Sequence, residues 1–225
     1  MNQMTRILKG ISNGDTIGGP CAMATIVANV CKHDTFDLQA LEKAYFNYYQ
    51  SGSFDSGPCF RQVHQLMEQG KTRKAAVKQT HRLFKQQTAG CNPMHRFAVV
   101  AGTSIPYEEL DKLARADAKL THFDEVAGIS SSVCVRLLRR IIDGQKLNEA
   151  YSTVLKELSS SEREQSDVLP TRSGYAPAVL AAAISFADDV AEGLSKAIHY
   201  AGTNNYCPPI TGALIETQLN WFISK

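Results

Sequence analysis

Apolar residues recur with helical spacing along almost the whole of this chain, and this pattern constrains its fold more than any other feature. Within residues 20–31, for example, Met23, Ile26, Val27 and Val30 share one apolar face. Steps of three and four residues place side chains on one side of an α-helix. No stretch alternates apolar and polar residues as a half-buried β-strand does. The sequence therefore predicts an all-α protein of roughly ten helices of ordinary length.

Prolines, glycines and acidic residues mark where these helices begin and end. Proline suits the first helical turn, aspartate caps the N-terminus, and glycine ends helices in the left-handed conformation. The predicted helices cover residues 20–31, 38–52, 58–70, 72–84, 106–120, 124–144, 147–158, 177–186, 189–202 and 208 onward.

One polar segment interrupts this pattern, at residues 159–172. It is rich in serine and glutamate, and we interpret it as a mobile surface connection and the only candidate linker. Because no other segment separates two apolar halves, we expect one domain over residues 1–225.

Charge and hydropathy limit the expected partners and location. The net charge is +2, and the basic runs Lys71–Lys74 and Arg136–Arg140 are interpreted as solvated helix faces. No apolar run approaches the ~18 residues that a membrane span needs. Met1–Gly10 lacks the long apolar core of a signal peptide. We therefore expect a cytoplasmic protein that binds neither nucleic acid nor membrane.

The spacing of the six cysteines also indicates an intracellular protein. No two of them are spaced as in a CxxC zinc site, and a chain of 225 residues can bury a core without disulfides. We expect reduced thiols, as in intracellular proteins, and no zinc site.

The residues that could carry chemistry fall mostly between the predicted helices. Five such segments each precede a helix N-terminus, where free N–H groups can bind phosphate. They are residues 13–19, 53–58, 89–96, 121–124 and 201–209.

Two of these segments place aspartates beside glycines. Asp15 precedes Gly18 and Gly19, and Asp55 precedes Gly57. Glycine lets the backbone approach a ligand closely, and a carboxylate can act as a general base or stabilise positive charge on a sugar. The alternative is that both aspartates only cap helices.

Histidine, arginine and amide side chains occupy the next two segments. Arg96 could bind a diphosphate through two parallel hydrogen bonds, and Asn92 and His95 lie in the same turn. Alternatively, Arg96 pairs with a nearby carboxylate and His95 is a satisfied surface residue. His122 stands at a helix start, where a lone histidine is more often structural than functional.

The last segment combines two amides, a hydroxyl and a thiol before a double proline: Thr203, Asn204, Asn205, Tyr206 and Cys207. A cysteine at a helix N-terminus can have a lowered thiol pKa, which is a weak indication of nucleophilic chemistry. The alternative is a rigid loop that Tyr206 packs against the protein.

Taken in order, these segments resemble the ADP-ribosylglycohydrolase family. Phe54–Gly57, followed by Arg61 and Leu66, resembles the family's FDxGxTxRxAL stretch, and Ala89–Arg96 resembles its GNGxxMR loop. Thr121–Asp124 resembles the family's TH-x-D helix start. Residues 174–175 and the helix after them, and then residues 201–213, resemble its last segments, which end in GGDxDTxxxxxGAL. The resemblance spans nearly the whole chain and implies the all-α ADP-ribosylglycohydrolase fold.

The chain departs from that family at its metal ligands. Members that hydrolyse ADP-ribose usually hold two divalent ions between a TDDT and a DxDT segment. These segments correspond here to Ile17–Pro20 and Thr203–Tyr206, neither of which is acidic. Mg²⁺ is a hard ion that prefers carboxylate oxygens. We therefore predict no metal ligands, and a binuclear Mg²⁺ or Mn²⁺ centre is doubtful here.

The resemblance assigns roles to the candidate residues. Asp55 matches the family's aspartate that acts at the ribose, and Asp15 would be the second carboxylate. The residues expected to contact an ADP-ribose-containing ligand are Gly18, Gly19, Gly57, Asn92, His95, Arg96, His122, Thr203, Asn204, Asn205, Tyr206 and Cys207.

Three functions remain open at this level. The first is hydrolysis of an ADP-ribosyl or related N- or O-glycosidic bond without the usual metals, in a small molecule or an ADP-ribosylated protein. The second is an inactive relative that binds ADP-ribose or a nucleotide. The third is a structural use of the fold, as in the lens crystallins of this family, without any ligand.

Overall fold

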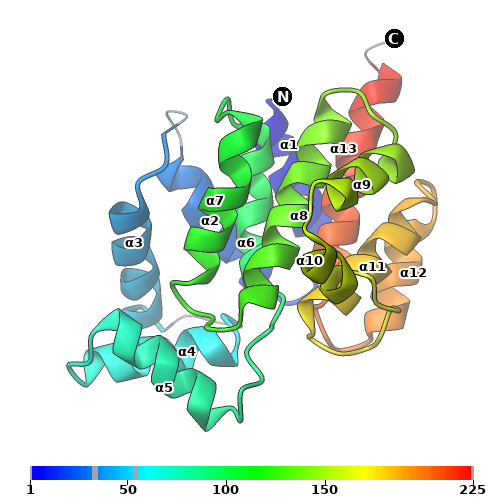
Figure 1. Ribbon diagram of the computed structural model, residues 1–225. Helices are drawn as coiled ribbons and strands as arrows, with labels where there is room; N and C mark the ends of the chain where they lie inside the picture. Colours follow the sequence, from blue (N-terminus) through cyan, green and yellow to red (C-terminus); the bar gives the residue numbers. More distant parts are fainter. Residues whose placement is uncertain (1, 32–34, 53–54, 224–225) are drawn as a thin grey trace.

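The structure, a computed structural model, describes residues 2–31, 35–52 and 55–223, with side chains through residue 219. Thirteen α-helices and one 3-10 helix make up this described part (Figure 1). It contains no β-strand, and a single isolated bridge joins Gly90 to Tyr175. The predicted all-α fold is therefore confirmed.

The elements follow one another in the order α1 (Gln3–Gly14), α2 (Gly19–Val30), α3 (Leu38–Gln50), α4 (Pro58–Glu68), α5 (Arg73–Leu83), α6 (Asn92–Phe97), η1 (Ala98–Gly102), α7 (Tyr107–Ala118), α8 (Glu125–Ile142), α9 (Leu147–Lys156), α10 (Ser160–Ser166), α11 (Ala176–Ala187), α12 (Gly193–Ala201) and α13 (Pro208–Ile223). Each helix predicted from the periodicity is present, with ends that differ by a few residues.

Three helical regions were not predicted. Helix α1 and the pair α6 and η1 lie where no helix was assigned, and α10 lies inside the segment interpreted as a mobile connection. A capping box between Ser159 and Glu162 fixes the start of α10 by satisfying two backbone N–H groups. Ser166, at the end of this helix, is buried. The expectation of an irregular connection was therefore wrong for this part of the segment.

Helix α8 is the centre of the molecule. All of its residues from 127 to 138 are buried, and Figure 1 shows it between α7 on one side and α9 and α10 on the other. A helix that is buried on every side belongs to the core rather than to the surface. One large apolar cluster surrounds it, and a small separate cluster lies between α4 and α5.

The first and last helices touch backbone to backbone. A Cβ added to Gly10 of α1 would lie 2.3 Å from the carbonyl oxygen of Gly212 in α13. A Cβ on Gly14 would lie 2.0 Å from the carbonyl oxygen of Pro208. Glycine is required for such an approach because it has no side chain to intervene. This contact brings the end of α1 beside the start of α13, where two of the candidate segments lie.

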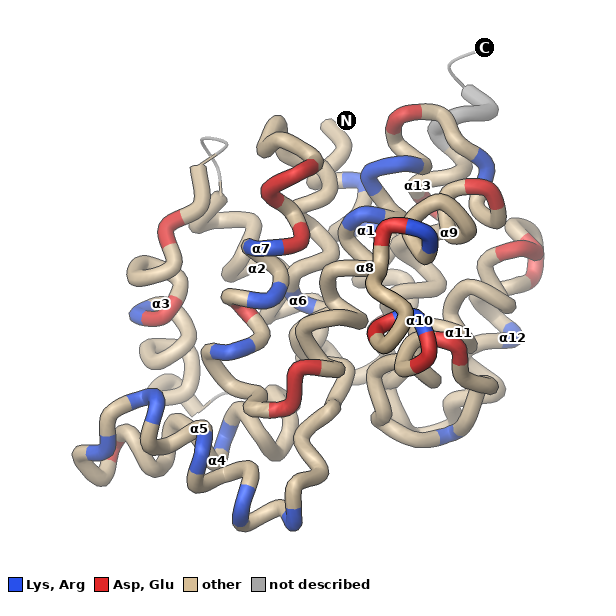
Figure 2. Tube along the Cα trace, viewed as in Figure 1, with Lys and Arg blue, Asp and Glu red and all other residues tan. Residues whose placement is uncertain are grey.

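The two basic runs differ in their exposure to solvent. Lys71 and Lys74 are exposed, as expected, and Figure 2 shows basic residues gathered along α5. Arg139 instead donates hydrogen bonds to the carbonyl oxygens of Ala101, Thr103 and Ile105 at 2.7–2.8 Å. Arg136 is buried. The interpretation of Arg136–Arg140 as a solvated face was wrong because these carbonyls after η1 need donors. Among the described residues, no helix combines the length and apolar character of a membrane span.

Candidate functional site

Asp15 and Asn205 meet where α1 ends and α13 begins. The side-chain amide of Asn205 donates a hydrogen bond to a carboxylate oxygen of Asp15. The amide oxygen of Asn205 accepts a hydrogen bond from the backbone N–H of Thr16 at 3.3 Å. Asn205 is buried, so both bonds fix its orientation. The first and last candidate segments are thus joined.

Asp15 also caps helix α2. One carboxylate oxygen accepts hydrogen bonds from the backbone N–H groups of Ile17 at 3.1 Å and Gly18 at 2.6 Å. The other accepts one from the N–H of Cys21 at 2.7 Å. The capping alternative weighed for Asp15 therefore has direct support, and its carboxylate is held in one orientation.

Asp55 lies against the start of α2. A Cβ added to Gly19 would lie 2.2 Å from the carbonyl oxygen of Asp55, so no larger residue fits there without displacing this loop. Asp55 itself has a left-handed backbone with φ of 46°. Ser53 and Phe54, which precede it, lie outside the described residues.

The carboxyl group of Asp55 has a perturbed pKa. Partial burial raises this pKa, and the nearby negative charge of Asp15 raises it further, while Arg61 lowers it. Like charges close together disfavour the ionisation of both groups. The two predicted catalytic carboxylates are therefore close enough to influence each other.

Asn92 connects the third candidate segment, residues 89–96, to the loop that contains Asp55. Its side-chain amide donates a hydrogen bond to the carbonyl oxygen of Ser56 at 3.4 Å. Gly57, which caps α4, packs against the same amide, since a Cβ there would lie 2.7 Å from it. Both predicted ligand residues are thus next to Asp55 in space.

His95 links the third segment to the fifth. Its Nε2 lies 2.6 Å from the backbone carbonyl oxygen of Tyr206, so Nε2 carries the proton and donates it. Burial lowers the pKa of His95 to about 4, which keeps the ring neutral near pH 7. The expectation of a surface histidine was therefore wrong, because His95 is enclosed and its Nε2 proton is already used.

Arg96 faces the core rather than a ligand. Its Nε donates to the Asp117 carboxylate at 2.8 Å, and its Nη2 donates to the Asp117 backbone oxygen at 2.9 Å. The guanidinium carbon also lies 4.7 Å from the centre of the Tyr45 ring. Arg96 and Asp117 are both fully buried. The predicted diphosphate contact of Arg96 is corrected to a buried ion pair, the alternative weighed from sequence.

His122 joins the fourth segment to the third. Its Nδ1 lies 2.8 Å from the Thr121 hydroxyl oxygen, and its Nε2 points toward Gly90, where a Cβ would lie 3.2 Å away. This Nε2 is buried and has no hydrogen-bond partner among the described residues. Burial, assisted by the positive charge of Arg96, lowers the pKa of His122 to about 3. The His122 ring is therefore neutral near pH 7, and its Nε2 makes no hydrogen bond to any described residue.

The fifth candidate segment, residues 201–209, is partly exposed and partly buried. Thr203 and Asn204 are exposed, and the Tyr206 ring packs against Gly174. Cys207 is buried, and burial raises the pKa of its thiol to about 11. The suggested lowering of this pKa was wrong, since loss of solvation outweighs the helix N-terminus.

A binuclear metal centre does not fit these residues. Asn205 points an N–H donor at the Asp15 carboxylate, whose two oxygens also accept three backbone N–H groups. A cation needs such oxygens free, and it is not attracted to N–H donors. Among the described residues, no three His, Cys, Asp or Glu side chains are grouped so that they could hold a metal ion.

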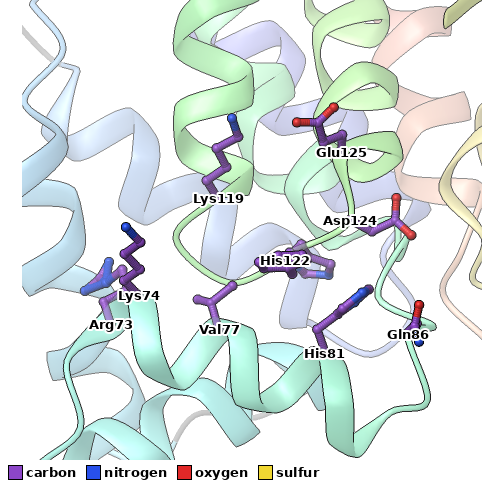
Figure 3. Close-up of a pocket in the computed structure, with 10 residues that line it drawn as sticks. Arg73, Lys74, Val77, His81, Gln86, Lys119, His122, Asp124 and Glu125 are labelled. Atoms are coloured by element: carbon purple, nitrogen blue, oxygen red, sulfur yellow. The ribbon is translucent and has the colours of Figure 1, made fainter. Parts of the chain in front are cut away.

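Two cavities lie beside the connected segments. One of about 430 Å³ is bordered by the Gly90 loop and by Tyr175. The other, of about 780 Å³, lies between α5 and the turn from α7 to α8 (Figure 3). Lys74, Lys119 and Phe123 line this larger cavity. These residues were not selected from the sequence, because no sequence pattern indicates that α5 faces this turn.

Comparison with known proteins agrees with the all-α fold. The sequence model of the ADP-ribosylglycohydrolase family matches residues 14–215. No curated protein matches the chain. Among solved structures, an ADP-ribosylglycohydrolase-related protein complex superposes with a TM-score of 0.72 at 20% sequence identity, over 96% of this chain and 88% of that chain. At this identity the likeness shows the fold. Because the family match extends over most of the sequence, the chain belongs to the ADP-ribosylglycohydrolase family.

Proposed function

We propose that this protein hydrolyses an ADP-ribosyl or related N- or O-glycosidic bond, with Asp55 as its catalytic carboxylate and without a binuclear metal centre. The observation that carries the proposal is the position of Asp55 against the start of α2, where Asp15 also lies. Partial burial there, and then the charge of Asp15, raise the pKa of Asp55. Family membership supports the reaction class. The substrate is a small molecule or a protein that carries ADP-ribose.

A raised carboxyl pKa favours proton transfer. A carboxylate exchanges protons most effectively when its pKa approaches the working pH. Asp55 would orient and deprotonate the attacking water, or stabilise the positive charge that develops at the anomeric carbon. Asp15 would act as a positioning residue, because its hydrogen bonds to Gly18 and Cys21 hold it in place beside Asp55.

The ligand would lie over the exposed side of this cluster. Gly18 has open space around it, and Thr203 and Asn204 are exposed. Asn92 lies against Gly57, two residues after Asp55 in the chain. These residues replace Arg96 as the candidates for ligand contact, because the Arg96 side chain has no exposed surface.

The test is release of free ADP-ribose from an ADP-ribosylated protein, measured with and without a chelator. We expect the wild type to release ADP-ribose equally in both conditions. Asp55→Asn should lower the rate by about 10²–10⁴-fold, as loss of a general acid or base does. ADP-ribose affinity, measured by calorimetry, should change little. Asp37→Asn, at the remote N-terminus of α3, is the control. Full activity of Asp55→Asn, or inactivation by the chelator, would reject the proposal.

A second function is binding of ADP-ribose or a nucleotide without hydrolysis. The capping of α2 by Asp15 favours it, because that carboxylate is engaged in a structural role. A ligand that binds only the native state raises the melting temperature. A thermal shift with ADP-ribose, combined with no release from any modified protein, would select this function. No thermal shift and no release would leave only the structural use of the fold.

A further inference from the structure

The larger of the two cavities has the features of a separate ligand site. It lies between α5, the end of α7 and the start of α8, and its volume of about 780 Å³ is within the range of small-molecule sites. Figure 3 shows side chains from these elements pointing into one space. Its lining residues are Arg73, Lys74, Val77, His81, Gln86, Lys119, His122, Phe123, Asp124 and Glu125.

Two lysines give this cavity a positive edge. Lys74 of α5 and Lys119 at the end of α7 are both exposed, and neither forms an ion pair with a described carboxylate. Arg73, in contrast, pairs with Glu42. Figure 3 shows Lys74 and Lys119 on the same side of the cavity. Unpaired cations at the edge of a cavity attract an anionic group.

An aromatic ring forms part of the wall. Phe123 lies against His81, with ring centres 4.7 Å apart, yet 47% of the Phe123 residue surface is exposed. A phenylalanine at a cavity offers a flat apolar face, and planar rings stack on such faces favourably. His81 is itself fixed, since its Nδ1 lies 2.6 Å from the Thr88 hydroxyl oxygen.

Acidic residues limit what the cavity can accept. Asp124 caps α8 by accepting the N–H of Val126 at 3.0 Å, and Glu125 follows it. Figure 3 shows Asp124 across the cavity from Lys74. A long polyanion would meet this negative charge, whereas a small ligand with one anionic end would avoid it.

We propose that this cavity binds a small aromatic phosphate of mononucleotide size. Its phosphate lies at Lys74 and Lys119, and its ring lies on Phe123. The site goes beyond the proposed glycosidic function, because Asp15, Asp55 and the 201–209 segment do not line this cavity.

Calorimetry with three probes tests the proposal: AMP, adenosine and inorganic phosphate. We expect AMP to bind the wild type at least about tenfold more tightly than either fragment, since it alone has both the ring and the charge. Lys74→Gln combined with Lys119→Gln should weaken AMP binding by about tenfold or more, and added salt should weaken wild-type binding. Phe123→Ala should weaken AMP and adenosine alike.

The control is Lys78→Gln combined with Lys112→Gln. These lysines lie on the same two helices, are exposed and do not line the cavity. An equal loss of AMP affinity in the Lys74/Lys119 and Lys78/Lys112 double variants would overturn the proposal. The absence of AMP binding by the wild type would also overturn it. Weaker AMP binding in the Lys74 and Lys119 double variant, with ADP-ribose release unchanged, keeps this result separate from the glycosidic site. AMP binding lost in Asp55→Asn and kept in the lysine variants would also overturn it.

Discussion

The side-chain amide of Asn205 donates a hydrogen bond to the carboxylate of Asp15, although 190 positions separate the two residues in the chain. Asn205 lies in one of the two segments that correspond to the family's metal-binding turns, and Asp15 lies two residues before the other. An amide donor therefore stands next to the carboxylate where a cation would otherwise be attracted. This hydrogen bond between an amide and a carboxylate joins the first loop to the last.

Removal of the Asp15 side chain should destabilise the protein. Asp15→Ala removes the acceptor of three backbone N–H groups at the start of α2 and leaves the buried amide of Asn205 without its partner. Loss of a cap costs about 0.5–2 kcal/mol, and the orphaned amide adds to this. Urea unfolding measures the difference. Asp37→Ala, which removes an ordinary cap from α3, is the comparison and should cost less. An equal or smaller loss in Asp15→Ala contradicts this account.

Stability should depend on pH through Asp55. Its pKa is raised in the folded protein, mainly by burial and then by Asp15, so the ionised form is disfavoured by folding. The folded state then holds the proton more tightly than the unfolded state, and this contribution to stability is lost as the pH rises through the folded pKa. Asp55→Asn should therefore have a higher melting temperature than the wild type at pH 7, and the gain should vanish at acidic pH.

Asparagine is a suitable replacement at this position, because it tolerates the left-handed backbone of Asp55. Thermal unfolding at several pH values measures the gain as a difference in melting temperature between Asp55→Asn and the wild type. Asp143→Asn, at an exposed carboxylate, controls for the change in net charge. A gain that is the same at every pH would show that the charge of Asp55 is not its cause.

Two glycines should respond oppositely to alanine. Gly19→Ala places a Cβ 2.2 Å from the backbone oxygen of Asp55, so the two loops must separate and the proposed site should lose its geometry. Gly128→Ala in α8 meets atoms no closer than 3.4 Å, and alanine is favoured over glycine in a helix by about 1 kcal/mol. Thermal unfolding and ADP-ribose release measure both effects. A stable and fully active Gly19→Ala protein would contradict the close contact.

The buried ion pair should be sensitive to loss of one partner. Asp117→Ala leaves the Arg96 guanidinium charged and unpaired in the core, and it removes the acceptor of the Tyr45 hydroxyl at 2.7 Å. Breaking such a pair costs about 3–5 kcal/mol. Glu192→Ala, which removes another exposed partner of Lys196, should change stability little. Chemical denaturation compares the two, and a similar small effect in both would show that the Arg96 charge is solvated.

Local features of the chain were sufficient to predict most of the helices. The spacing of Met23, Ile26 and Val27 defines α2, and the Gly-Pro steps before α2 and α4 set their starts, because these signals act within one or two turns. Asp37 and Asp124 stand directly before α3 and α8, and both accept N–H groups two or three residues ahead. Such contacts depend only on neighbours in sequence. The resemblance to the family likewise depended only on the order of the five loop segments along the chain.

Only the tertiary structure decided what those loops do. Arg96 pairs with Asp117, Nε2 of His95 donates to the carbonyl of Tyr206, and Cys207 is buried with a raised thiol pKa. Each outcome depends on which distant segments pack together, as when Gly10 meets Gly212 and brings Asp15 to Asn205. Burial and long-range partners fix the charge, the proton position and the accessibility of a side chain, and these are properties of the packed molecule rather than of its local sequence.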